Sequence, residues 1–239
     1  MSDHTTNDFG QPVGNPSAGW TARPRPDGRP LAGRTAQLEK LSGGHADDLY
    51  AAMAEDDGRM WTYMAYGPFA DQAAFRDWVE TSAKSTDPFY YAIISQQSGK
   101  ALGWASLMRI TPEHGVIEVG SIAYAPALRK TVMATEAMTL MMAHAFDDLG
   151  YRRYEWKCDS LNAPSRAAAH RLGFIFEGIF PQHIIYKGRN RDTAWFSITD
   201  RDWPAVKAAH QAWLQPENFD ADGEQIKPLS ALTQSCARR

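Results

Sequence analysis

The hydrophobic pattern is most regular in the middle of the chain, over residues 116–178. It opens with an apolar run whose β-branched residues are typical of a buried strand. After a short loop, apolar side chains recur at three- and four-residue spacing, which predicts a long helix. A second strand is predicted at residues 152–159, and the short helix after it ends at Gly173. This region is therefore predicted to form two successive strand–loop–helix units.

The pattern on either side of this region predicts the other elements. The predicted elements are a strand at 35–41, helices at 45–55 and 71–84, strands at 89–95, 101–110 and 174–180, a hairpin at 183–199 and a helix at 200–214. An irregular aromatic stretch at 59–69 separates the first two helices, and Asp71 can cap the second. The three strands that end at residue 124 follow one another through tight turns, so we expect an antiparallel meander.

These elements belong to one domain with two loose ends. Residues 1–33 are rich in Gly and Pro and show no period, which predicts a flexible arm with Trp20 and Leu31 as candidate anchors. Residues 216–239 are polar and predict a mobile tail. Residues 34–215 are expected to form a single α/β domain of the α+β type, in which helices flank a mixed, mostly antiparallel sheet.

Composition and charge narrow the possible functions. Of the 239 residues, 44% are hydrophobic and the formal net charge is −3, which favours a globular protein without general affinity for nucleic acid. No segment approaches the length of a membrane span, and the polar N-terminus has no secretory pattern. Cys158 and Cys236 lie far apart and predict neither a disulfide nor a metal site. We expect a cytoplasmic protein without a metal.

Candidate chemistry centres on the loop before the long helix. Arg129 and Lys130 lie where a helix N-terminus presents free N–H groups, an arrangement that can hold a phosphate. The hydroxyls of Thr131 and Thr135 could add donors. The alternative is a solvated basic turn before an amphipathic helix.

The order of elements and several short motifs resemble the GCN5-related N-acetyltransferase (GNAT) superfamily, and in particular its RimJ/RimL-type branch. The resemblance covers roughly residues 34–215. The motifs that carry it are Arg129–Lys130–Thr131–Val132–Met133–Ala134 with Thr135–Glu136–Ala137, Asn162–Ala163–Pro164–Ser165, Leu172–Gly173–Phe174 and Glu177–Gly178. It implies a sheet that splays into a V-shaped cleft, with acetyl-CoA as co-substrate and a primary amine as acceptor.

The resemblance also implies which residues bind the coenzyme. Backbone groups of Ile122, Ala123 and Tyr124 would pair with the pantetheine amides, as an added strand does. Asn162 and Ser165 would lie beside the pantetheine arm and the thioester. The pyrophosphate would be held by Arg129, Lys130, Thr131, Val132, Met133, Ala134 and Thr135. The family's loop glycine is Val132 here, and its β-branched side chain predicts weaker wrapping of the pyrophosphate.

A catalytic base is needed because a protonated amine has no lone pair with which to attack. Glu118 is the first candidate, and strand alternation would place it on the same face as Gly120 and Ile122. In an apolar wall its pKa would be raised; alternatively, it faces outward or pairs with an arginine. His183 is a second candidate base. Ser165 is the candidate general acid, or else a helix N3 residue that bonds back to Asn162.

The resemblance also implies where the acceptor binds. The resemblance places it near Trp61, Tyr63, Tyr66 and His183, and both protein N-termini and small-molecule amines suit this branch. The acidic net charge weakly favours a cationic amine. Two alternatives stay open, namely transfer of another acyl group such as succinyl and a non-catalytic acyl-CoA-binding or sensing domain. A homodimer is possible.

Overall fold

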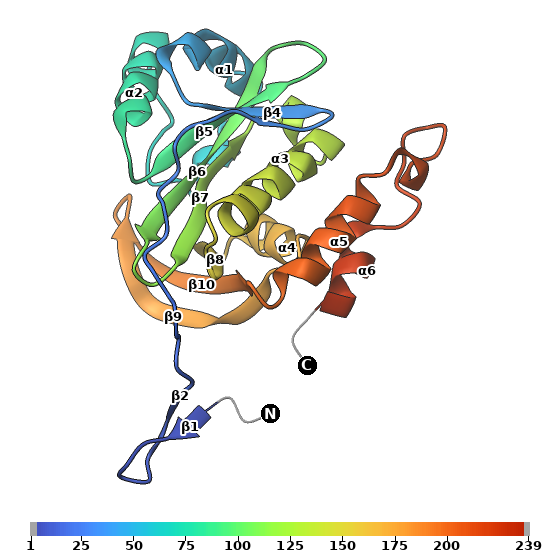
Figure 1. Ribbon diagram of the computed structural model, residues 1–239. Helices are drawn as coiled ribbons and strands as arrows, with labels where there is room; N and C mark the ends of the chain where they lie inside the picture. The colour runs from blue at the N-terminus through green and yellow to red at the C-terminus, as the bar shows by residue number, and fades with distance from the viewer. Residues whose placement is uncertain (1–3, 237–239) are drawn as a thin grey trace.

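The computed structural model describes residues 4–236 and is built on an eight-stranded sheet (Figure 1). The strand order is β3-β4-β5-β6-β7-β8-β10-β9, and β7 and β8 are the one parallel pair of this sheet. The strands are β3 (Leu31–Ala32), β4 (Ala36–Lys40), β5 (Phe89–Ser95), β6 (Ala101–Thr111), β7 (Val116–Tyr124), β8 (Arg153–Asp159), β9 (Ile175–Tyr186) and β10 (Arg189–Thr199). The predicted mixed, mostly antiparallel sheet and its β5–β6–β7 meander are confirmed.

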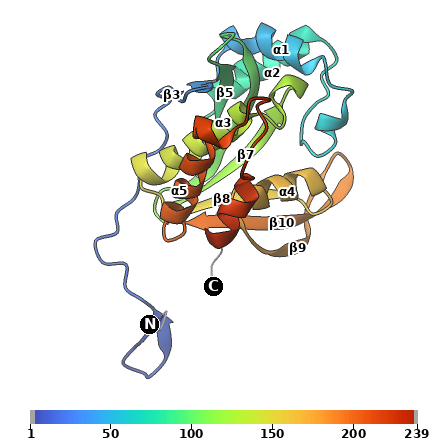
Figure 2. The same cartoon turned by 90° about the vertical axis from the view of Figure 1, so that its right-hand side faces the viewer.

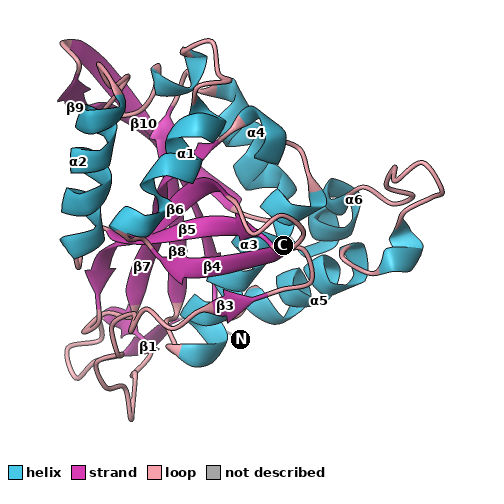
Figure 3. Ribbon diagram, turned by 90° about the horizontal axis from the view of Figure 1, so that it is seen from above, coloured by secondary structure: helices cyan, strands magenta, loops and turns pink. Residues whose placement is uncertain are grey.

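Helices cover the sheet on both faces (Figure 3). The helices are α1 (Ala46–Met53), α2 (Gln72–Lys84), α3 (Val132–Ala143), α4 (Ala163–Arg171), α5 (Trp203–Trp213) and α6 (Leu229–Thr233). Alternate residues of β5 divide the core, because Tyr91 and Ile93 join the cluster under α3, α4 and α5, whereas Tyr90 and Ala92 join the cluster under α1 and α2.

Three short polar side chains cap the N-termini of α2, α3 and α4. The carboxylate of Asp71 accepts the N–H of Ala74 at 2.8 Å, which caps α2 as predicted. Thr131 caps α3, and Asn162 caps α4 by accepting the N–H of Ser165 at 3.2 Å. These caps satisfy N–H groups that the first helical turn leaves unpaired.

The parallel ladder between β7 and β8 is short. It runs from Val116–Arg153 to Val119–Trp156 and then ends, so the two strands diverge beyond it. A bulge interrupts β7 in the same region, where Ser121 has a φ of 49°. The bulge reverses the alternation, and Ile122 therefore packs in the α3-side core instead of on the face of Glu118. The predicted common face of Glu118 and Ile122 is thus wrong.

The N-terminal arm lies along the domain for part of its length. The indole N–H of Trp20 donates to the Glu113 carbonyl at 2.8 Å, the N–H of Arg23 donates to Pro112, and Leu31 is buried. The hairpin β1 (His4–Thr6) and β2 (Pro12–Gly14) stands away from the body of the protein (Figures 1 and 2). Both predicted anchors make contacts, and residues 1–3 lie outside the described part of the chain.

The C-terminal segment differs from the predicted polar tail. Its helix α6 packs beside α5, with Leu229 fully buried in the main core (Figure 3). Asn218 connects the intervening loop, because its amide donates to the carbonyls of Trp213 and Lys227. The apolar residues of this segment show no period, so the sequence pattern did not predict α6, a helix of about one and a half turns. Residues 237–239 lie outside the described structure.

Candidate active site

The edge of β7 that faces β8 is open beyond Val119. Residues 122–124 belong to β7, and Ala123 and Tyr124 pair with Trp104 and Gly103 of β6 on the other side. Among residues 4–236, no β8 partner continues the ladder past Trp156. A ligand with alternating amide groups could therefore hydrogen-bond to this edge as an added strand would.

The basic loop before α3 is tied to neighbouring elements. The guanidinium of Arg129 donates to the Tyr124 carbonyl at 3.0 Å and forms a short ion pair with Asp56. Burial would raise the pKa of Asp56, but hydrogen bonds from Arg129 and from the N–H groups of Met60 and Gly58 outweigh it and lower that pKa. Lys130 is exposed beside the helix N-terminus, with a φ of 60°. Arg129 therefore shapes the loop, and Lys130 carries its exposed charge.

The first turn of α3 directs its two hydroxyl groups to different places. Thr131 accepts the N–H of Ala134 at 3.1 Å and donates to the Leu128 carbonyl at 2.7 Å. Thr135 is buried one turn later and accepts a hydrogen bond from Arg171 at 3.0 Å. The Thr135 hydroxyl also donates to the Thr131 carbonyl at 3.4 Å, so it lies between the end of the loop and Arg171 of α4. Val132 and Met133 are half-buried against the main core, and Ala134 is buried.

Asn162 and Ser165 lie where β8 passes into α4. Ser165 is the N3 residue of α4, because its N–H bonds to the Asn162 side chain. Its hydroxyl oxygen accepts the indole N–H of Trp156 at 3.0 Å. This bond uses an oxygen lone pair and not the hydroxyl hydrogen. Burial raises the pKa of the neighbouring Cys158 thiol, which makes it a poor nucleophile.

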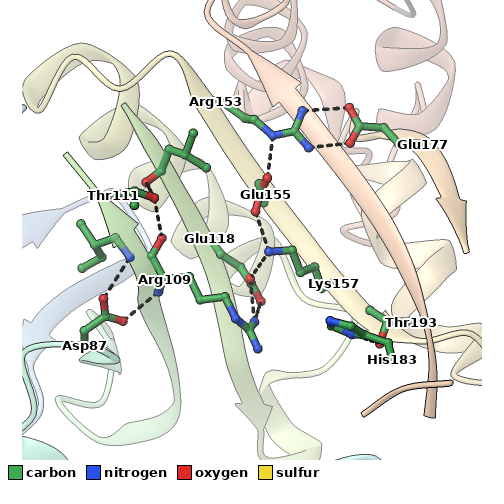
Figure 4. Close-up of polar contacts among 12 residues, drawn as sticks. Asp87, Arg109, Thr111, Glu118, Arg153, Glu155, Lys157, Glu177, His183 and Thr193 are labelled. Atoms are coloured by element: carbon green, nitrogen blue, oxygen red, sulfur yellow. Dashed lines mark hydrogen bonds and ion pairs between the residues drawn. The ribbon is translucent and has the colours of Figure 1, made fainter. Parts of the chain in front are cut away.

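Glu118 is held by two cations at the point where β7 and β8 diverge (Figure 4). Arg109 of β6 donates to its two oxygens at 2.9 and 2.8 Å, and Nζ of Lys157 lies 2.9 Å from it. The Glu118 side chain is 3% exposed. The expected apolar surroundings of Glu118 are therefore wrong, and the arginine-paired alternative holds. The sequence did not show these charges because Arg109 and Lys157 come from the strands on either side of β7.

The ionic network continues across the sheet from Glu118. Nζ of Lys157 also lies 2.6 Å from Glu155, and it stands 3.9 Å from the centre of the Trp195 ring. Arg153 joins Glu155 at 2.6 Å and is bound in turn by Glu177 (Figure 4). Glu118 and Glu155 thus each contact two cations, which offsets the cost of removing their charge from water.

His183 borders the same network from β9. Its Nδ1 lies 2.9 Å from the Thr193 hydroxyl (Figure 4). Its ring contacts Phe180 and Trp195. Burial lowers the pKa of His183, and the charges of Arg191, Arg109 and Lys157 lower it further. The imidazole is therefore neutral at neutral pH, and a neutral imidazole can accept a proton.

The aromatic stretch at 59–69 is largely core. Trp61 and Tyr66 pack with Phe69, Trp78 and Trp104, and the Tyr66 hydroxyl accepts the indole N–H of Trp104 at 3.0 Å. Burial raises the pKa of Tyr66 well above its usual range. Tyr63 differs, because its hydroxyl reaches across to the Leu161 carbonyl at 3.2 Å.

The turn between β9 and β10 binds the same aromatic stretch. Nζ of Lys187 donates to the carbonyls of Trp61 and Gly67 at 2.8 and 2.6 Å, and Arg189 donates to that of Thr62 at 2.7 Å. The sequence did not reveal this bridge, nor the roles of Arg109, Lys157 and Trp195. Strand alternation does predict that Lys157 lies on the same face of β8 as Glu155, and this was the one sequence signal for the role of Lys157.

Two kinds of feature are not found in residues 4–236. No group of three or more His, Cys, Asp or Glu side chains there is arranged to hold a metal ion. No helix in that part of the chain is both long and apolar enough to cross a membrane.

An open strand edge beside a helix N-terminus, with polar side chains where the parallel pair diverges, is the candidate acyltransferase site that the resemblance to the GNAT superfamily implies. The chain matches the "Acetyltransferase (GNAT) domain" family over residues 36–175. It therefore belongs to the GNAT acetyltransferase family and is an N-acetyltransferase by family. Members of this family generally use acetyl-CoA and act on acceptors that bear an amine.

Solved structures and a curated relative agree with this assignment. The crystal structure of a GCN5-related N-acetyltransferase from Brucella melitensis is 50% identical, with a TM-score of 0.88, and the match covers 90% of this chain and 99% of the other. A probable GNAT acetyltransferase from Chromobacterium violaceum is 39% identical, with a TM-score of 0.76, over 82% of this chain and 98% of the other. The "Uncharacterized N-acetyltransferase p20" of Bacillus licheniformis is 26% identical over 62% of this chain and 84% of its own length.

Proposed function

We propose that the protein transfers the acetyl group of acetyl-CoA to a primary amine by direct attack of the amine on the thioester. The observation that carries this proposal is the end of the β7–β8 ladder at Val119 and Trp156. It leaves an open backbone edge at residues 122–124, which follow Glu118 along β7 and precede the loop to the N-terminus of α3. Acetyl-CoA would supply an activated acetyl group at this edge.

The residues around the divergence suit three separate tasks. The backbone of Ile122, Ala123 and Tyr124 would bind the pantetheine arm, and a backbone N–H of this strand would donate a hydrogen bond to the acetyl oxygen as negative charge develops on it. The N-terminus of α3 with Lys130 would bind the pyrophosphate. Arg129 would contribute by fixing the loop through its contacts with Tyr124 and Asp56.

The proton balance assigns roles to His183 and Ser165. The amine nitrogen forms a bond to the acetyl carbon, the carbon–sulfur bond breaks, and the amine must lose a proton. We assign that proton to His183, because its imidazole is neutral, whereas both oxygens of Glu118 already accept ionic hydrogen bonds. Glu118 would then order Arg109 and Lys157. Ser165 would donate its hydroxyl proton to the departing thiolate and regain one from solvent, and His183 would release the amine's proton to solvent.

Release of free thiol tests this function and its alternatives together. The purified protein is incubated with acetyl-CoA or succinyl-CoA and a panel of primary amines, and acylated amine is identified by mass spectrometry. The proposal expects amine-dependent thiol release with acetyl-CoA. Faster release with succinyl-CoA would favour the other acyl group. Coenzyme binding without any transfer would favour the sensing domain instead.

The finer predictions rest on resemblance. A ribosomal-protein-serine acetyltransferase structure from Vibrio cholerae is similar in fold, at 18% identity and a TM-score of 0.63. That degree of identity supports the fold alone. Membership of the RimJ/RimL-type branch, a protein N-terminus as acceptor, a homodimer and a cytoplasmic location therefore stay predictions.

A further inference from the structure

Five neighbouring strands direct charged or polar side chains to one area beside His183. Arg109 comes from β6, Glu118 from β7, Lys157 from β8, His183 from β9 and Arg191 from β10 (Figure 4 shows the first four). The Thr193 hydroxyl joins the last two, because it lies 2.9 Å from His183 and accepts a hydrogen bond from Nε of Arg191 at 3.0 Å. This acceptor face is defined by the six residues just named.

The acceptor face carries more positive than negative charge. Arg109, Lys157 and Arg191 are the cations that act on His183, and Glu118 is the carboxylate that opposes them. Glu118 is already shared between Arg109 and Lys157. Arg191 forms no ion pair with a carboxylate within residues 4–236. This local excess of positive charge is opposite in sign to the chain's net charge of −3.

The acidic groups closest to Arg191 along the strands are engaged by neutral donors. Asp159 stands opposite Thr193 in the ladder and accepts hydrogen bonds from the Tyr186 hydroxyl at 2.8 Å and the N–H of Leu161 at 2.9 Å. Asp192 accepts from the N–H of Gln182 at 2.8 Å and from the side chain of Asn190. Arg191 is therefore able to bind a further anion.

An apolar surface lies next to these cations. The rings of Phe180 and Trp195 stand 4.5 Å apart, centre to centre, and both contact His183. The side chain of Arg109 is 49% exposed, and Phe180 is 50% exposed. A ligand can therefore reach a guanidinium, an imidazole and an aromatic ring at once.

We propose that the acceptor is a primary amine that also carries a carboxylate, which the guanidinium groups of Arg109 and Arg191 bind while the amine lies beside His183. The inference rests on the proposed function and specifies its acceptor. An apolar group of the acceptor would pack on Phe180 and Trp195. Arginine suits a carboxylate because its planar fork can donate two parallel hydrogen bonds. The net charge of the chain weakly favoured a cationic amine, whereas the charges of the acceptor face favour a zwitterionic one.

Two sources could present this chemistry, a free amino acid and a peptide that begins with an acidic residue. The first test arm compares phenylalanine, phenylalaninamide and phenethylamine, which differ at the carboxylate. The second compares peptide amides that begin with Asp and with Asn. The proposal expects kcat/KM at least about tenfold higher for the carboxylate member of one arm, which corresponds to about 1.4 kcal/mol. Equal values within both arms would overturn it.

A binding measurement tests the anion site without depending on transfer. The dissociation constants of N-acetylphenylalanine and N-acetylphenylalaninamide are compared by calorimetry for the wild type, Arg191→Met and the control Arg76→Met. Arg76 is on α2 and pairs with Asp47, away from the acceptor face. The carboxylate should bind about tenfold more tightly in the wild type and in R76M, and R191M should reduce this ratio towards one.

The two measurements separate the inference from the function on which it rests. A ratio of one in the wild type, or an unchanged ratio in R191M, would overturn the carboxylate site even if amines are acetylated. A carboxylate preference in binding, with no amine-dependent thiol release for any amine, would refute the transferase activity and leave the anion site standing.

Discussion

Lys157→Met removes the buried cation that joins the carboxylates of β7 and β8, and it should destabilise the fold. The Lys157 side chain is 5% exposed, and its Nζ lies 2.9 Å from Glu118 and 2.6 Å from Glu155. Methionine keeps most of the side-chain length that packs on Trp195. The substitution therefore removes the charge with little loss of volume.

The magnitude follows from what each carboxylate keeps. Removing one member of a buried ion pair costs about 3–5 kcal/mol, because the other charge is left without compensation. Here Glu118 keeps Arg109, and Glu155 keeps Arg153. We therefore expect the free energy of unfolding to fall by about 3 kcal/mol, at the low end of that range. The melting temperature of a chain of this size would fall by roughly 6–12 °C.

Urea unfolding at pH 7 measures this loss, and Lys207→Met is the matched control. Lys207 pairs with Asp147 at 3.0 Å, but its side chain is 39% exposed, so its loss should cost no more than about 1 kcal/mol. If K157M were as stable as K207M, the ion pairs of Lys157 would not stabilise the fold, and the predicted loss of about 3 kcal/mol would be refuted. A double variant with Glu118→Gln measures the coupling between the two side chains.

Three further predictions concern the reaction and the C-terminus. With amine saturating, kcat should fall as the pH drops below about 6.5, because the pKa of His183 is lowered and a protonated imidazole cannot accept the proton. His183→Asn should remove this fall of kcat at acid pH. An unchanged pH profile in that variant would exclude His183 as the base. Lys130→Glu should raise the KM for acetyl-CoA roughly tenfold through repulsion of the pyrophosphate, and an equal rise in the KM for the amine in steady-state kinetics would contradict the assignment. Leu229→Ala should lower the free energy of unfolding by about 2–5 kcal/mol because the side chain is fully buried. Ile226→Ala, at a position 60% exposed, should have little effect. Equal unfolding curves for the two variants would mean that α6 does not pack against the core in solution.

Local sequence rules accounted for most of the elements and for the family. The run of β-branched residues at β7, the spacing of apolar residues in α3 and the capping residues Asp71 and Asn162 depend on chain neighbours only. Such interactions are set by the backbone period and by side chains three or four residues apart, so they are visible in one dimension. The resemblance to the GNAT family used the same local motifs.

The partners of the candidate site residues come from distant parts of the chain. Glu118 meets Lys157 because a parallel pair needs a long crossover, which brings residues 39 positions apart side by side. The bulge at Ser121 moved Ile122 to the other face, a change that simple alternation cannot show. The positive acceptor face illustrates the same limit, because net charge is a sum over the chain, whereas the field at His183 depends on which strands are neighbours. Periodicity and capping thus determined the elements, and the short motifs carried the resemblance to the family. The sheet order and register decided which charges surround the divergence of β7 and β8.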